Sequence, residues 1–154
     1  MKIGIIFYSL SGHTLSVVKK ITARMSALGH HVEMQRLEPA EPFKLTALTI
    51  ALKSIPSVKE YDVLVLASPV HGGRLASPIA AFFEKAPSLK GKKVVCVGTH
   101  FLSYEMGGRQ MLELMQAACQ QKGAHVVGTA NVFRLSLRQK KYINAIVALL
   151  EKAI

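Results

Sequence analysis

Tyr8-Ser9-Leu10-Ser11-Gly12-His13-Thr14 joins an apolar run at residues 3–7 to a helical pattern that follows directly. Backbone N–H groups at a helix N-terminus have no intrahelical partner and carry partial positive charge, so they bind anions. The hydroxyls of Ser9, Ser11 and Thr14 can donate further hydrogen bonds. Because this loop contains no lysine, it suits a phosphomonoester that stays bound better than a phosphate that is transferred.

Apolar patterning predicts strands that alternate with helices along the whole chain. The predicted strands cover residues 3–8, 31–37, 63–67, 93–98 and 125–130, and the predicted helices cover residues 14–28, 45–55, 77–85, 108–122 and 136–153. Five such β-then-α units with short connections indicate an α/β fold, a doubly wound five-stranded parallel sheet with helices on both faces. Ligands bind such sheets beyond the carboxyl ends of the strands, so the loops that follow the strands are the candidate site.

Length and composition predict one domain over residues 1–154, because half of the 154 residues are hydrophobic. The net charge of +11 favours an anionic partner. The basic residues are scattered and lack interleaved aromatic rings, so we expect solvated helix faces and no nucleic acid. The N-terminus has no signal-peptide pattern, and no apolar stretch has the length of a membrane span. We therefore expect a cytoplasmic monomer or homodimer without membrane insertion.

The two cysteines, Cys96 in a strand pattern and Cys119 in a helical one, have a spacing that fits no metal or redox motif. We expect both to be small buried hydrophobic residues, and we predict no metal site. Other phosphate-binding patterns are absent as well. Neither the P-loop pattern Gly-x-x-x-x-Gly-Lys-(Ser/Thr) nor a Gly-x-Gly-x-x-Gly fingerprint follows the first strand.

Two further loops after predicted strands, at residues 68–74 and 99–108, are rich in Gly, Ser, His and aromatic residues. Together with Ser9-x-Ser11-Gly12-x-Thr14, which looks like a (Ser/Thr)-x-Thr-Gly-x-Thr phosphate loop, they resemble the flavodoxin-like family over essentially the whole chain. The resemblance implies strand order 2-1-3-4-5 and the cofactor flavin mononucleotide (FMN). It implies a phosphate site made of Ser9, Leu10, Ser11, Gly12, His13 and Thr14. It also implies that two loops hold the isoalloxazine ring, one with Ser68, Pro69, Val70, His71, Gly72 and Gly73, the other with Thr99, His100, Phe101, Tyr104, Gly107 and Gly108.

Within this implied site, His71, Phe101 and Tyr104 are the candidate ring faces. Gly72 and Gly73 can let the backbone approach the ring. We expect the His13 ring to point outward beside the phosphate. Positive charge near the ring, from Arg74, His71 and His100 by sequence, predicts a higher reduction potential than in acidic relatives.

The sequence departs from the acidic electron carriers of the family, because it is strongly basic and has no Trp. It looks more like the flavodoxin-fold oxidoreductases. The resemblance thus implies an FMN-binding redox protein, either an electron carrier or an FMN-dependent oxidoreductase that reduces a small substrate. Its partner would be a redox protein or a small-molecule electron acceptor. No side chain is assigned as a catalytic acid or base. The alternative is a non-catalytic binding or regulatory module with a degenerate flavin site.

Overall fold

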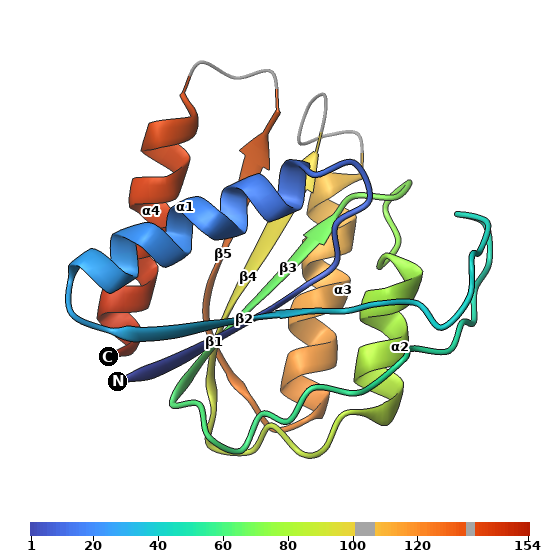
Figure 1. The fold of residues 1–154 in the computed structure, drawn as a ribbon, viewed down its shortest axis with the longest axis horizontal. Helices are drawn as coiled ribbons and strands as arrows, with labels where there is room; N and C mark the ends of the chain where they lie inside the picture. The colour runs from blue at the N-terminus through green and yellow to red at the C-terminus, as the bar shows by residue number, and fades with distance from the viewer. Residues whose placement is uncertain (101–106, 135–137) are drawn as a thin grey trace.

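The structure is a computed structural model that describes residues 1–100, 107–134 and 138–154 (Figure 1). Its elements in chain order are β1 (Lys2–Phe7), α1 (His13–Ala27), β2 (His31–Arg36), β3 (Val63–Pro69), α2 (Ser77–Lys85), β4 (Lys93–His100), α3 (Gly108–Gln121), β5 (His125–Phe133) and α4 (Gln139–Ala153). The strands form a five-stranded parallel sheet in the order β2-β1-β3-β4-β5. The predicted fold class and strand order are therefore confirmed.

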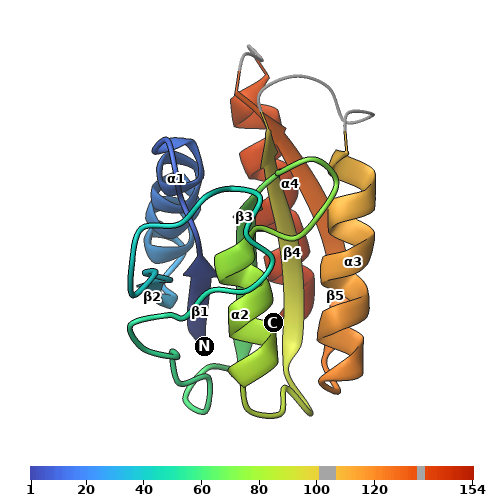
Figure 2. The same cartoon turned by 90° about the vertical axis from the view of Figure 1, so that its right-hand side faces the viewer.

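Helices cover both faces of the sheet (Figure 2). The apolar faces of α1 and α4 pack on one side with Ile5 of β1, and those of α2 and α3 pack on the other side with Ile6. Successive side chains of a strand point to opposite faces, so neighbouring residues of β1 enter different cores. The central strands β1, β3 and β4 are buried on both faces, which explains their continuous apolar sequences.

The chain order reverses at β1, which pairs with β2 on one side and β3 on the other. The register aligns Phe7 with Ala67 and Pro69 with Thr99. The segments that follow β1, β3 and β4 therefore leave the sheet at the same edge. This is the topological switch point where doubly wound sheets bind ligands.

The predicted helix over residues 45–55 is wrong. Within the described residues no helix lies between β2 and β3, so the structure has four helices where the sequence indicated five. Tertiary hydrogen bonds satisfy the backbone of this segment instead. Arg74 Nη2 donates to the Leu45 carbonyl at 3.2 Å, and the Ser77 hydroxyl donates to the Ala47 carbonyl. These bonds remove the need for helical pairing and hold the segment beside the start of α2.

Three strands run further than predicted, β3 to Pro69, β4 to His100 and β5 to Phe133. The first two residues of the predicted last helix, 136 and 137, lie outside the described residues, and α4 begins at Gln139. Within the described part of the chain, no helix is long and apolar enough to cross a membrane.

The prediction of buried cysteines is confirmed, because Cys96 and Cys119 are both fully buried. Their sulfur atoms lie 3.9 Å apart between β4 and α3. The contact with Cys119, followed by burial, raises the pKa of the Cys96 thiol well above its usual range. The Cys96 thiol is thus protonated at neutral pH, and both buried cysteines pack as apolar groups.

Candidate functional site

The loop between β1 and α1 leads directly into the N-terminus of α1. Gly12, the residue before the first helical residue, has a φ of 88° and carries no side chain that could cap the helix. The Ser9 hydroxyl accepts a hydrogen bond from the Leu15 amide at 3.2 Å. Arg36 of β2 holds the loop from outside, donating from Nη2 to the Ser9 carbonyl at 2.9 Å. The first-turn amides are therefore arranged to bind an anion.

Thr99, at the end of β4, connects this loop to the rest of the site. Its Oγ1 lies 2.6 Å from Oγ1 of Thr14, and both residues are buried. The Thr99 carbonyl accepts a hydrogen bond from the Val70 amide at 3.0 Å. One residue thereby fixes the positions of the loops after β1 and β3 relative to β4.

The loop after β3 closes in a tight turn from His71 to Arg74, whose amide donates to the His71 carbonyl at 3.3 Å. Gly72 and Gly73, in its centre, both have positive φ values, 62° and 79°, a backbone conformation that favours glycine. The His71 ring packs edge-on against Tyr8, with ring centroids 6.4 Å apart and planes at 84°. Burial, and then the charge of Arg74, lower the pKa of His71, so its imidazole is neutral at pH 7.

The start of α3 touches this turn directly. Gly107 has a φ of 95°, and a Cβ there would lie 2.6 Å from the Gly73 amide nitrogen. Only glycine permits this approach of two backbones. Next to it, the buried ring of His100 packs on Phe133 with ring centroids 4.2 Å apart. Gly108 leaves room for this ring, because a Cβ there would lie 3.1 Å from His100 Cε1.

These loops enclose a cavity of about 150 Å³ at the carboxyl edge of the sheet. Its lining residues are Leu10, Ser11, His13, Thr14, Pro69, Val70, His71, Thr99, His100 and Arg134, with no Asp or Glu among these described side chains. A larger cavity of about 550 Å³ lies within residues 40–51 and shares none of them. We place the site at the smaller cavity, because it lies at the switch point of the sheet.

Nine of the predicted residues line this cavity, and others support it. Seven further predicted residues surround the cavity without being among its lining residues. Ser9, Gly12, Gly72, Gly73 and Gly107 lie in the loops, Ser68 lies in β3, and Gly108 begins α3. Phe101 and Tyr104 lie outside the described residues, so their predicted contact with a ring stays a prediction. The Arg74 guanidinium is directed to the Leu45 carbonyl and does not line the cavity.

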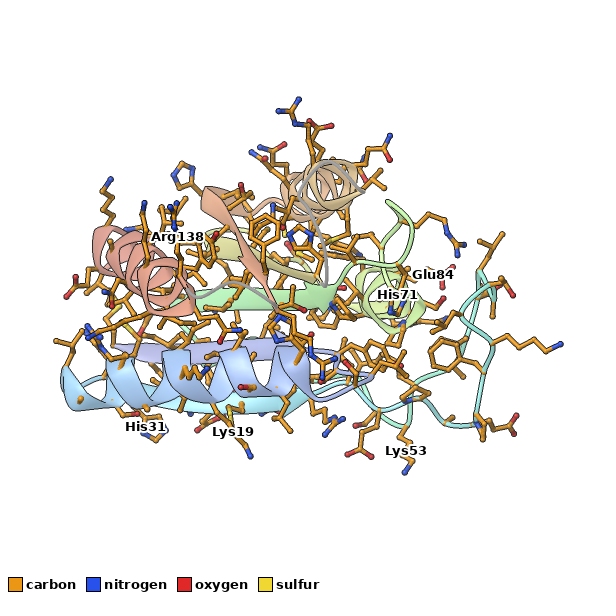
Figure 3. All side chains as sticks on the ribbon, turned by 90° about the horizontal axis from the view of Figure 1, so that it is seen from above. Lys19, His31, Lys53, His71, Glu84 and Arg138 are labelled. Atoms are coloured by element: carbon orange, nitrogen blue, oxygen red, sulfur yellow. The ribbon has the colours of Figure 1, made fainter. Side chains whose placement is uncertain are left out.

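Arg134 is a lining residue that sequence reasoning missed. Its amide donates to the His100 carbonyl at 2.8 Å. The β4–β5 register pairs His100 with Phe133, so Arg134 is the next residue at the edge of the site. A correct end for β5 would have revealed Arg134 in the sequence, because the strand ends three residues later than predicted, directly before this arginine. Figure 3 looks onto this edge from above, with His71 on the α2 side and Arg138 on the α4 side.

The expectation that the His13 ring points outward is wrong. His13 is half-buried and lines the cavity, and its Nε2 is buried without a hydrogen-bond partner among the described residues. Burial lowers its pKa, a hydrogen bond with the Val132 backbone opposes this, and the charges of Arg134 and Lys20 lower the pKa further. A bound anion would act in the opposite direction and favour the protonated imidazole of His13.

The described residues fit FMN. Hydroxyls and helix amides suit its phosphate. The described lining of the cavity, which holds Arg134 and no carboxylate, suits both a phosphate and a reduced, partly anionic flavin. The buried Nε2 atom of His13 is a polar group that the described residues leave unsatisfied at this place.

Comparison with known proteins agrees with this site. The family model described as "NADPH-dependent FMN reductase" matches residues 1–134. The chain is 30% identical over 133 residues to a flavodoxin of Megasphaera elsdenii, covering 84% of this chain and 85% of that protein. It is 27% identical over 96 residues to an NAD(P)H dehydrogenase (quinone) of Azorhizobium caulinodans, covering 57% of this chain but only 48% of that protein.

Solved structures show the same fold. The oxidised flavodoxin 2 of Bacillus cereus superimposes with a TM-score of 0.76 at 22% identity, with all of both chains covered. A flavodoxin of Streptococcus pneumoniae superimposes with a TM-score of 0.73 at 16% identity. On the strength of the family match, the chain belongs to the NADPH-dependent FMN reductase family and is a flavodoxin-like, FMN-binding redox protein.

Proposed function

We propose that this protein is a single-domain electron carrier that uses bound FMN and exchanges electrons with another protein. The observation that carries this proposal is the extent of its likeness to a flavodoxin, which covers 84% of this chain and 85% of the relative at 30% identity. The chain spans about half the length of the NAD(P)H dehydrogenase (quinone) relatives that it matches, 48% in one case. The arrangement of all nine elements around one sheet supports a single domain.

In this proposal the phosphate is held by the first-turn amides of α1 and by the hydroxyls of Ser11 and Thr14. Arg134 adds positive charge at the same cavity, and His13 contributes its buried Nε2 atom. The Thr14–Thr99 hydrogen bond fixes the hydroxyl geometry before the ligand arrives, which reduces the entropy lost on binding.

The loops after β3 and β4 would hold the isoalloxazine ring. Val70 and His71 come from one loop, and His100 comes from the end of β4. When bound, FMN supplies transfer of one or two electrons. The described lining of the cavity supports a carrier for two reasons: it includes no carboxylate, and the pKa of His71 is lowered. Neither a carboxylic acid nor a protonated His71 is therefore offered by this lining as a proton donor to a substrate at neutral pH.

Stopped-flow reduction tests the proposal. The FMN-loaded protein is mixed anaerobically with NADPH and, separately, with a reduced low-potential ferredoxin, while flavin absorbance is followed. We expect NADPH to reduce the bound FMN no faster than it reduces free FMN. Reduced ferredoxin, by contrast, should reduce the bound FMN during the time that the stopped-flow experiment records. Rapid reduction by NADPH, followed by multiple turnovers with added FMN or a benzoquinone, would overturn the carrier assignment.

That second outcome corresponds to the other candidate, an FMN or quinone reductase. It is favoured by the match of residues 1–134 to the NADPH-dependent FMN reductase model. A reductase must bring a nicotinamide next to the flavin ring. Oxidised NADP⁺ would then inhibit the reduction competitively, and this inhibition separates the two functions independently of the rate itself.

A further inference from the structure

Basic side chains gather on two neighbouring helices and at the end of one strand. We call this surface the cationic face, and its residues are exposed at the end of β5, on α1 and at the start of α4: Lys19, Lys20, Arg24, Arg134, Arg138, Lys140 and Lys141. The sequence contains no Asp or Glu from residue 1 to 32 or from residue 114 to 150. All seven residues of the cationic face, among the 20 Lys and Arg residues of the chain, lie within these two stretches of sequence.

The two helices bring these charges together. Lys20 Nζ donates to Gln139 Oε1 at 2.9 Å, and Arg24 Nη1 donates to Asn144 Oδ1 at 3.0 Å. Both cations are thus positioned by neutral amides, which leave their charge uncompensated. Between the helices lies an open groove of about 310 Å³, lined by Lys20, Arg24 and Lys140 among others.

The cationic face is continuous with the FMN cavity. Arg134 belongs to both, since it is exposed at the end of β5 and lines the cavity. His13 lies close enough to Arg134 and Lys20 for both charges to act on its ring. A protein that docks on this face would therefore lie beside the cofactor, where electrons enter or leave.

We propose that the cationic face is the docking surface for an acidic electron-transfer protein. This inference rests on the proposed carrier function. Opposite charges steer such partners together and raise the association rate. A lipid surface is disfavoured, because among the described residues no large apolar side chain is exposed within α1 or α4. Single-stranded nucleic acid is disfavoured too, since the one aromatic ring of α4, Tyr142, packs on Phe133 with centroids 5.6 Å apart.

The test compares two triple variants with the same net charge. Lys20→Gln/Arg24→Gln/Lys140→Gln removes charge from the cationic face, and Lys59→Gln/Lys85→Gln/Lys90→Gln removes it from exposed sites outside this face. Each lowers the net charge by three, from +11 to +8. Both variants and the parent protein are loaded with FMN. The probe is a plant-type [2Fe–2S] ferredoxin with net negative charge, and its binding is measured by calorimetry at low and high salt.

We expect the ferredoxin to bind the parent protein at low salt and to weaken steeply as salt is added. The face variant should bind at least tenfold more weakly at low salt, and the control variant within twofold of the parent. Equal weakening by both variants, or binding that salt does not change, would overturn the proposal. Tighter binding to a DNA duplex or to anionic vesicles, lost in the same face variant, would also overturn it.

Electron transfer in the same samples separates this inference from the carrier function. Each reduced [2Fe–2S] centre gives up one electron, which FMN takes up, so the iron–sulfur centre is oxidised as the flavin is reduced. If ferredoxin binds through the cationic face but transfers no electron, the docking surface stands and the carrier function fails. If transfer is rapid and equal in the face and control variants, the carrier function stands and the docking surface fails.

Discussion

Replacing Thr14 by Val should weaken FMN binding without disturbing the fold. Thr14 is buried, with 1% of its surface exposed, and its hydroxyl lies 2.6 Å from that of Thr99. Valine has nearly the same shape, so the core around α1 keeps its packing. What disappears is one hydroxyl at the cavity and the partner of the Thr99 hydroxyl.

Two energies follow from this geometry. Leaving the Thr99 hydroxyl buried without its partner should cost about 1–3 kcal/mol of folding stability. Losing one hydrogen bond to a charged phosphate should cost about 1.5–3 kcal/mol of binding free energy. At about 1.4 kcal/mol for each factor of ten, the dissociation constant for FMN should rise roughly 10- to 150-fold.

Titration of the apoprotein with FMN, followed by flavin fluorescence, measures this change. The matched control is Thr22→Val on the same helix, because the Thr22 hydroxyl is also buried but has no hydrogen-bond partner among the described residues. Its affinity for FMN should stay within twofold of the parent protein. If Thr14→Val also binds FMN within twofold of the parent, Thr14 does not hold the phosphate and the reasoning is refuted.

Three other predictions concern the frame and charge of the site. In urea titrations, Gly107→Ala should lower the free energy of unfolding by about 2 kcal/mol more than Gly29→Ala. Both glycines have positive φ, but only a Cβ at Gly107 meets backbone, 2.6 Å from the Gly73 amide nitrogen. Equal losses in the two variants would contradict the contact between these loops. Hydrogen bonds from the Tyr61 hydroxyl, then from His31 and Lys2, lower the pKa of Glu33 from its usual 4.5 to about 2. The stabilising effect of the Glu33 carboxylate is therefore complete above pH 4.5 and is lost as the pH falls towards 2. In Glu33→Gln this part of the pH dependence of the thermal unfolding temperature should vanish, and an unchanged loss of stability in acid would exclude Glu33 as its source. Arg134→Gln should lower the reduction potential of bound FMN in a potentiometric titration. The substitution removes from the cavity a positive charge, which favours the reduced, partly anionic flavin. An unchanged potential would show that the charge of Arg134 does not act on the flavin ring.

The layering could be predicted because it depends on patterns that are local in the sequence, whereas the strand order was implied by the resemblance to the flavodoxin-like family. Residues 63–67 form a continuous apolar run that is typical of a strand buried on both faces. The helix over residues 77–85 was predicted with its observed bounds, since Pro78 stands in its first turn. The loop that we propose for the phosphate could be located in the sequence, because its hydroxyls and glycine are contiguous.

Features that depend on distant contacts could not be predicted in this way. Residues 45–55 have helical apolar spacing, but Arg74 and Ser77 take up two of their carbonyl groups, and no local pattern reveals those bonds. Arg134 looked like one of many surface cations. Its place in the cavity depends on the register of β5 against β4. The inward position of His13 depends likewise on the Val132 backbone, which is remote in sequence.

The central claim is that the loop from Ser9 to Thr14 holds the phosphate of FMN. Its most direct test is a titration of the apoprotein with FMN and with riboflavin, which has the same ring but no phosphate. Two or more charge-assisted hydrogen bonds, at about 1.5 kcal/mol or more each, predict that FMN binds at least ~100-fold more tightly than riboflavin. Equal affinity for the two flavins would contradict the account.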